Sequence, residues 1–387
     1  MASRKDGQGF KGNVGEWAEP FVLMHLLANN VLHYADSDCK KIEGSPVIVD
    51  SIYRVESDGT ELAFVVVKSV SLDDEDGSVL VLKNGENVGV IPKRVFGEHA
   101  HSLFENLRGD KKGDDSTDGE FLRRIGLKSL KSPATAKADL VAKVYDGFVG
   151  AILARRYSIK ALIGANPSLS NASGKAYFEY ELIGFDEEKR DDVMSITPEN
   201  ERSWVVERTK RVVELCTAPP IPMVPDKVFE RNLKKCYWRT LEAVGYGLLY
   251  GQTIRGKRLP DSILKIEEIN PGSWTNEEIE DYDFGIRKYL WAIVFGMDPS
   301  IPWRGPDVVD GYLIATKDEE VLAYQVSRQR DFENYLLKHS SFDTPSTSRH
   351  ERVGVVRREN GKWYYSLQCV VKFQPKSWNG DESFFNR

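Results

Sequence analysis

A strand pattern with a lysine at its centre is the feature of this sequence that most restricts its fold. Residues 157–163, YSIKALI, are mostly apolar or β-branched and run into Gly and Asn-Pro turn signals, which is typical of a strand. Because side chains alternate between the two faces of a strand, Ser158, Lys160 and Leu162 share one face. A lysine inside an apolar strand either reaches solvent or serves a function. The face that carries Lys160 is therefore either exposed or functional.

A second strand is expected just upstream, and it begins at an acidic residue. Residues 138–145 and 155–163 predict two strands and residues 176–184 a third, with Asp139 at the start of the first. An acid at the start of one strand and a lysine on the next are the arrangement of the PD-(D/E)xK nucleases. In that arrangement a carboxylate holds Mg²⁺, which prefers oxygen ligands, and the metal polarises a phosphodiester. The lysine, here Lys160, orients the attacking water or stabilises the developing charge.

The connection between the two strands decides whether these side chains can meet. A tight two-residue turn at 146–147 would place Asp139 opposite Ala154, which is short of the lysine. The connection must therefore run longer, to about Leu153, or include a bulge near Gly150.

The acidic position of the motif is occupied by Ser158, and a serine is a poor metal ligand. A second carboxylate must then come from another part of the chain. Glu16, on a predicted helix, is the first choice, and the other candidates are Asp146, Glu179 and Glu181. Acids near a helix N-terminus also occur simply because they suit the helix dipole. The structural alternative to an active site is an edge strand whose lysine faces water.

The composition is typical of a soluble globular protein, with 387 residues of which 41% are hydrophobic and 29% charged. No apolar stretch is long enough for a membrane span, and the start lacks the apolar region of a secretory signal. Cys39, Cys216, Cys236 and Cys369 are scattered and form no CxxC pair, which argues against zinc and favours a reducing cytoplasm. The net charge of −6 argues against non-specific coating of nucleic acid and leaves a local basic cleft open.

The pattern along the chain predicts a mixed α/β (α+β) protein. Helices are expected over 12–32, with Asn13 as a cap and Pro20 as a bend, over 225–250, and over 275–295 behind a capping box. Four segments are expected, in chain order: an N-terminal helix and β-rich region (1–120), a PD-(D/E)xK-like catalytic core with a mixed central sheet (121–190), a helical region (191–300) and a C-terminal β-rich, DNA-contacting region (301–387).

Three blocks of the sequence resemble the HpaII-type restriction endonucleases. The first is GNVGEWAE at 12–19, which is similar to the family's GNKGEWSE. The second joins KAD (137–139), SIK (158–160) and SNAS (170–173), and it is similar to the family's "SIKS…LLNAS" segment. The third joins TPSTSRH (344–350) to the GKWYY and VVKF segments near the C-terminus. The blocks occur in the family's order and extend over nearly the whole chain.

The resemblance implies a type II restriction endonuclease that cleaves double-stranded DNA with Mg²⁺. Named relatives act at a short palindromic CCGG site, which suits a homodimer on the DNA. A companion cytosine DNA methyltransferase and a prokaryotic cytoplasm are expected with such an enzyme. The implied site uses Asp139 and Glu16 as metal ligands, Lys160 to position water and Ser158 as a supporting residue.

Two polar segments supply candidate contacts to DNA. Hydroxyl groups and an arginine suit phosphate oxygens, and an arginine also fits a guanine edge. Residues of the same kinds are common in ordinary turns, where they bond their own backbone. The candidates are Asn171, Ser173, Ser346, Ser348, Arg349 and His350.

Two other functions remain open from the sequence. One is a PD-(D/E)xK nuclease that acts on methylated, branched or damaged DNA, and the other is a degenerate, non-catalytic DNA-binding protein, which Ser158 favours. A rival nuclease motif begins at Asp307, where Gln325 would replace the lysine. Pro20 and Ala161 depart from the family pattern, which puts the DNA sequence in question more than the reaction.

Overall fold

In the computed structural model the chain forms two compact units, and both are made of segments that are separated in the sequence. Unit 1 comprises residues 1–167 and 308–332, and unit 2 comprises residues 168–307 and 333–387. Unit 1 therefore takes the whole of the first predicted segment and parts of the second and fourth. The structure describes residues 9–44, 47–67, 77–109, 117–133, 138–147, 149–161, 163, 169, 174–199, 203–254, 258–305, 309–325, 329–343, 351–374 and 378–386.

Unit 1 is built on a mixed sheet whose described strands run in the order β1-β11-β10-β7-β6-β2-β3-β4-β5. The strand β7 pairs with β6 in the antiparallel sense and with β10 in the parallel sense, so it lies inside the sheet. Because β1 also pairs with β2, the strands from β1 to β2 in this order form a closed circuit. The bounds are β1 (Val31–Tyr34), β2 (Val47–Val55), β3 (Glu61–Val67), β4 (Ser78–Lys83), β5 (Glu86–Pro92), β6 (Leu140–Asp146), β7 (Ala151–Ala161), β10 (Gly311–Ala315) and β11 (Val321–Gln325).

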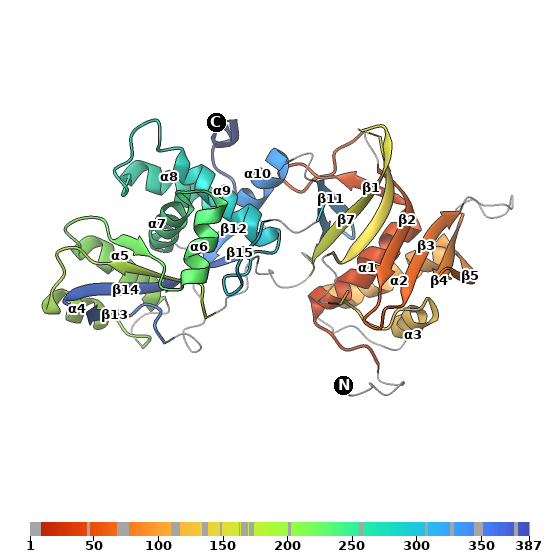
Figure 1. Ribbon diagram of the computed structural model, residues 1–387, viewed down its shortest axis with the longest axis horizontal. Helices are drawn as coiled ribbons and strands as arrows, with labels where there is room; N and C mark the ends of the chain where they lie inside the picture. Colours follow the sequence, from red (N-terminus) through yellow and green to blue (C-terminus); the bar gives the residue numbers. More distant parts are fainter. Residues whose placement is uncertain are drawn as a thin grey trace. The chain divides into compact units, whose positions relative to one another are not determined.

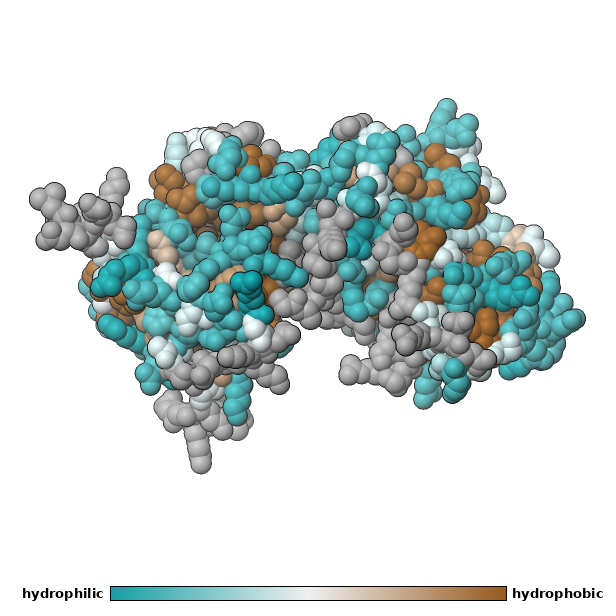
Figure 2. Space-filling model, turned by 180° about the vertical axis from the view of Figure 1, so that it is seen from behind, coloured by the Kyte–Doolittle hydropathy of each residue, from teal (hydrophilic) through white to brown (hydrophobic). Residues whose placement is uncertain are grey.

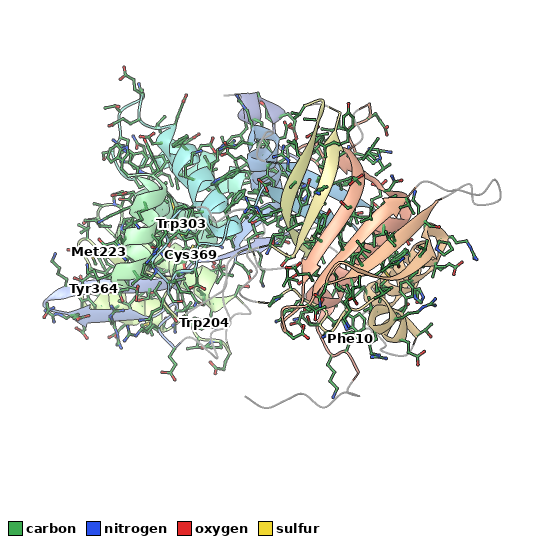
Figure 3. The ribbon with its side chains drawn as sticks, turned by 45° about the vertical axis from the view of Figure 1, so that its right-hand side comes forward. Phe10, Trp204, Met223, Trp303, Tyr364 and Cys369 are labelled. Atoms are coloured by element: carbon green, nitrogen blue, oxygen red, sulfur yellow. The ribbon has the colours of Figure 1, made fainter. Side chains whose placement is uncertain are left out.

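Three helices pack on this sheet and enclose its apolar core: α1 (Val14–Asn29), α2 (Lys93–Arg108) and α3 (Thr117–Arg124) (Figure 1). The helix α1 is buried on most sides, since nine of its sixteen residues are buried, and its N-terminus is capped by Asn13 as predicted. It continues through Pro20 without ending. Just before it lies Phe10, which is labelled in Figure 3 and packs edge-on against Trp17, with ring centroids 6.3 Å apart. This contact ties the chain ahead of α1 to the core.

Unit 2 combines helices with two small antiparallel sheets, one in the order β13-β14-β8-β9 and the other formed by β12 and β15. Its central helix α7 is almost wholly buried. The strand bounds are β8 (Tyr177–Glu181), β9 (Ile221–Met223), β12 (Ser340–Asp343), β13 (Val356–Glu359), β14 (Lys362–Gln368) and β15 (Val370–Phe373). The helix bounds are α4 (Glu187–Met194), α5 (Trp204–Leu215), α6 (Lys227–Cys236), α7 (Thr240–Thr253), α8 (Leu259–Ile269), α9 (Asp281–Val294) and α10 (Gln329–His339), which begins in unit 1, and a 3₁₀ helix spans Glu382–Asn386.

The structure confirms a mixed α+β protein with a mixed sheet and corrects the start of one predicted helix. The segment 225–250 is helical as predicted, and its helical residues belong to α6 and α7. Half of the box at Thr275 forms, because Glu278 accepts hydrogen bonds from the Thr275 amide and hydroxyl, yet α9 begins only at Asp281. These hydrogen bonds therefore stabilise a turn that precedes α9.

Among the described residues, no helix combines the length and the apolar character that a membrane crossing requires. On the face shown in Figure 2, hydrophobic residues lie in separate groups among hydrophilic ones.

Candidate active site

The β6–β7 hairpin has the register that the predicted site requires. Asp146 pairs with Ala151 and Leu140 with Tyr157, so the connection spans residues 147–150. Gly150 ends it with a φ of +71°, and its amide donates to the Asp146 carbonyl over 2.7 Å. The connection is thus longer than two residues but stops before Leu153. Compared with a two-residue turn at 146–147, this connection shifts the pairing so that the residue just before β6, Asp139, lies beside Ser158.

Asp139 lies at the end of this ladder, and its carboxylate is held by the neighbouring strand. Its amide donates to the Tyr157 carbonyl over 2.9 Å. Its Oδ2 atom accepts hydrogen bonds from the Ser158 hydroxyl (2.9 Å) and from the Ile159 amide (2.7 Å). Ser158 therefore orients the carboxylate of Asp139 through a hydrogen bond. This role does not require the serine to bind a metal.

Lys160 lies on an interior strand and not on an edge. The strand β7 has partners on both sides, and Lys160 pairs with Ile314 of β10. The edge-strand alternative is therefore wrong. Burial lowers the pKa of Lys160, whereas the nearby carboxylates of Asp139 and Glu19 act in the opposite direction. The ammonium group thus shares its surroundings with two acids.

The second carboxylate of this cluster belongs to Glu19 on α1. Its Oε2 atom accepts a 2.9 Å hydrogen bond from the Ser132 amide and lies 3.7 Å from Nη1 of Arg54. Burial and the adjacent charge of Asp139 raise the pKa of Glu19 to about 8, although Ser132, Arg54 and Lys131 oppose the change. A cation beside Asp139 would therefore stabilise the charged form of Glu19.

Glu16, the first choice from the sequence, is placed differently. Its Oε2 atom accepts the Asn13 amide at 3.0 Å, which completes a capping box, and its Oε1 atom lies 2.8 Å from Nζ of Lys131. These contacts lower its pKa. Its carboxylate thus closes the N-terminus of α1. The sequence offered one hint of Glu19 as the second carboxylate. It lies three residues after Glu16, about one turn further along the same predicted helix.

The other candidate acids lie elsewhere. Asp146 is fully buried at the far end of the hairpin, where the Tyr34 hydroxyl donates to it over 2.5 Å. Glu179 and Glu181 are on β8 of unit 2 and pair with Arg357 and Lys362. Among the described residues, no contact therefore brings Asp146, Glu179 or Glu181 to the carboxylate of Asp139.

Comparison with known proteins identifies the family of this chain. The family model of the HpaII restriction endonucleases matches residues 13–373. The chain belongs to this family. It is therefore a restriction endonuclease, a site-specific deoxyribonuclease. It is 26% identical over 369 residues to the "Type II restriction enzyme HpaII" of Haemophilus parainfluenzae, covering 94% of this chain and 99% of that protein. No solved structure matches.

The residues predicted to contact DNA in this restriction endonuclease lie outside the described residues. This applies to Asn171, Ser173, Ser346, Ser348, Arg349 and His350, and to Asp307 of the rival motif. The described part of the chain also holds no group of three or more His, Cys, Asp or Glu side chains placed to bind a metal. What it does hold is the pair Asp139 and Glu19 with Lys160 beside them.

Proposed function

We propose that this restriction endonuclease is a type II enzyme that cleaves double-stranded DNA at a short specific sequence by Mg²⁺-dependent phosphodiester hydrolysis. The observation that carries the proposal is the convergence of Asp139, Glu19 and Lys160, from β6, α1 and β7, in one half-buried cluster. We propose that α1, the β6–β7 hairpin and β10 form a PD-(D/E)xK-like core, in which Ser158 occupies the acidic position of the motif.

The donor set suits a hard divalent cation. Mg²⁺ usually binds one or two protein carboxylates and completes its shell with water and substrate phosphate oxygens, so a pair of acids is sufficient. The raised pKa of Glu19, caused by burial and by Asp139, is what such a pair shows before a cation compensates its charge. Asp139 and Glu19 would hold the ion, which supplies polarisation of the phosphodiester and activation of water when bound.

The protein's own groups then have distinct tasks. The hydrogen bonds from Ser158 and Ile159 fix Oδ2 of Asp139 and so set the direction of the carboxylate. Lys160 would hold the attacking water through its ammonium group and stabilise negative charge that develops on the phosphate. Because Lys160 is partly desolvated, that charge acts in a medium where electrostatic interactions are stronger than in water.

The finer properties of the enzyme follow from the family resemblance. We propose a CCGG-like recognition sequence, a homodimer on the DNA and a companion cytosine methyltransferase in a prokaryotic cytoplasm. A palindrome matches the two-fold symmetry of such a dimer.

The test compares cleavage of unmethylated phage DNA in Mg²⁺ and in EDTA. The wild type should give discrete fragments only with Mg²⁺, and Asp139→Asn, Lys160→Ala and Glu19→Gln should give none. The matched control is Glu16→Gln, which keeps a residue suited to the capping box and should cleave normally. Mapping the fragment ends tests the CCGG-like site.

Three results would reject the proposal. Specific DNA binding by the wild type without any strand cleavage would identify a degenerate binding protein. Cleavage by Lys160→Ala at the wild-type rate would show that the catalytic site lies elsewhere. Cleavage restricted to methylated or damaged DNA would point to the modification-dependent nuclease.

A further inference from the structure

A buried ion pair lies behind the proposed active site. Arg54, at the second-to-last position of β2, and Glu56, just after the strand, are 5% and 1% exposed, and their Nε and Oε1 atoms are 2.9 Å apart. Removing two charges from water costs several kcal/mol per ion and is compensated only when further hydrogen bonds satisfy both partners. The other hydrogen bonds of Arg54 and Glu56 therefore indicate what this ion pair does in the structure.

Both members of the pair bind the same short loop, residues 128–132. Nη2 of Arg54 donates to the carbonyls of Ser129 (2.8 Å) and Leu130 (3.0 Å). Oε2 of Glu56 accepts the amides of Lys128 and Ser129 and the Ser129 hydroxyl, each over 3.1 Å. Three consecutive residues of the loop are thus fixed to the end of β2.

The last residue of this loop touches both acids of the proposed site. The Ser132 amide donates to Oε2 of Glu19 over 2.9 Å, and its hydroxyl donates to the Asp139 carbonyl over 2.6 Å. Nη1 of Arg54 lies 3.7 Å from the same Oε2 atom of Glu19. The ion pair therefore reaches Glu19 by two routes, directly through the guanidinium and indirectly through the loop.

We propose that Arg54 is a positioning residue for the metal site: with Glu56 it fixes loop 128–132 so that Ser132 holds the carboxylate of Glu19 beside Asp139. This inference rests on the proposed function of Asp139 and Glu19. Arg54 itself touches neither substrate nor metal. Its effect is exerted on the place and direction of one ligand.

The expected effect is on metal affinity. Groups that orient metal ligands change the affinity by 10- to 100-fold when they are removed. Arg54→Met removes the guanidinium contacts to Glu19 and to the loop. Arg54→Lys keeps the charge but cannot donate in several directions at once, so it should recover only part of the affinity. Ser132→Ala removes the hydroxyl contact to the Asp139 carbonyl and leaves the amide contact to Glu19.

The experiment titrates the full-length protein with Mn²⁺ in the absence of DNA and follows free Mn²⁺ by electron paramagnetic resonance. Arg54→Met should bind Mn²⁺ about 10- to 100-fold more weakly than the wild type, with Arg54→Lys in between. The matched control is Arg208→Met. Arg208 is equally buried (6% exposed) and also donates to carbonyls, those of Ile196, Gly354 and Met194, but it lies in unit 2. That variant should lose stability and keep its Mn²⁺ affinity.

The outcomes separate this inference from the proposed function. If Asp139→Asn and Glu19→Gln abolish Mn²⁺ binding but a folded Arg54→Met binds as the wild type does, the positioning role is rejected and the metal site stands. Should Arg54→Met fail to fold, a folded Arg54→Lys that binds Mn²⁺ as tightly as the wild type rejects the role in the same way. If the wild type binds no Mn²⁺, or if the two acid variants bind it unchanged, the metal site at Asp139 and Glu19 is rejected in the free protein and the positioning role fails with it.

Discussion

The Ser158 hydroxyl donates a 2.9 Å hydrogen bond to Oδ2 of Asp139. This contact gives the serine at the acidic position of the nuclease motif a specific task. The same oxygen also accepts the Ile159 amide over 2.7 Å, and that bond comes from the backbone. A substitution at position 158 therefore removes only one of the two contacts that direct the acid.

Replacing Ser158 should therefore slow cleavage without abolishing it. In Ser158→Ala the Ile159 amide still holds Asp139, and losing one hydrogen bond to a charged group costs about 1.5 kcal/mol, or roughly tenfold in rate. Single-turnover cleavage at saturating Mg²⁺ measures this. Asp139→Asn is the comparison, and it should be inactive. Equal loss in the two variants would mean that the hydroxyl itself takes part in the reaction.

Glu19→Gln should change the pH dependence of stability in EDTA. The pKa of Glu19 is raised to about 8 in the folded protein by burial and by Asp139, whereas its ordinary value is 4.5. Between these pH values the folded state holds a proton that the unfolded state has lost, so stability falls as the pH rises from about 4.5 to about 8. The glutamine removes this contribution, which is on the order of a few kcal/mol.

Thermal melts from pH 5 to pH 8.5 measure this effect. Across that pH range the melting temperature of the wild type should fall further than that of Glu19→Gln. At pH 8 the variant should have the higher melting temperature. Glu16→Gln serves as the control because Glu16, unlike Glu19, has a lowered pKa through its contacts with Lys131 and Asn13. Parallel curves for wild type and Glu19→Gln would contradict the raised pKa.

The parts of the site that the sequence predicted are those that local pattern determines. Side-chain alternation placed Ser158 and Lys160 on one face of a strand, and the turn signals placed β6 next to β7. The requirement for a longer connection followed from counting residues, and Gly150 satisfies it with a left-handed conformation that suits glycine. Asn13 was recognisable as a cap because its residue type and position have a local physical reason.

The choice between Glu16 and Glu19 could not be made from local pattern. Both lie near the start of one helix, and helical spacing puts them on similar faces. What distinguishes them is contact with distant segments: Glu16 is engaged by Asn13 and Lys131, and Glu19 by Ser132 and Arg54. The interior position of β7 likewise depends on β10, which follows it by about 150 residues. Such pairings have no signal within a short window of sequence.

Glu16→Ala should weaken the helix α1 and leave the reaction intact. The alanine loses the hydrogen bond to the Asn13 amide, and losing one half of a capping box costs about 1 kcal/mol. The exposed pair with Lys131 adds little, because surface ion pairs contribute about 0–1 kcal/mol. Urea unfolding should show a lower midpoint with an unchanged slope, and cleavage by the folded variant should equal that of the wild type. Loss of cleavage at full stability would return Glu16 to the list of metal ligands.

Gly150→Ala tests whether the hairpin connection sets the register of the site. Gly150 has a φ of +71°, and an added Cβ would meet no atom within 4 Å, so the cost comes from the backbone alone and should be about 1–2 kcal/mol. Gly89, on β5, is a matched control, because its surroundings are equally open and its φ is not positive. Thermal melts should show a lower melting temperature for Gly150→Ala than for Gly89→Ala. Seven residue pairs hold β6 to β7, so the register should survive the strain and cleavage should continue. A folded Gly150→Ala variant that no longer cleaves DNA would show that the glycine turn, and not the strand ladder, keeps Asp139 beside Ser158.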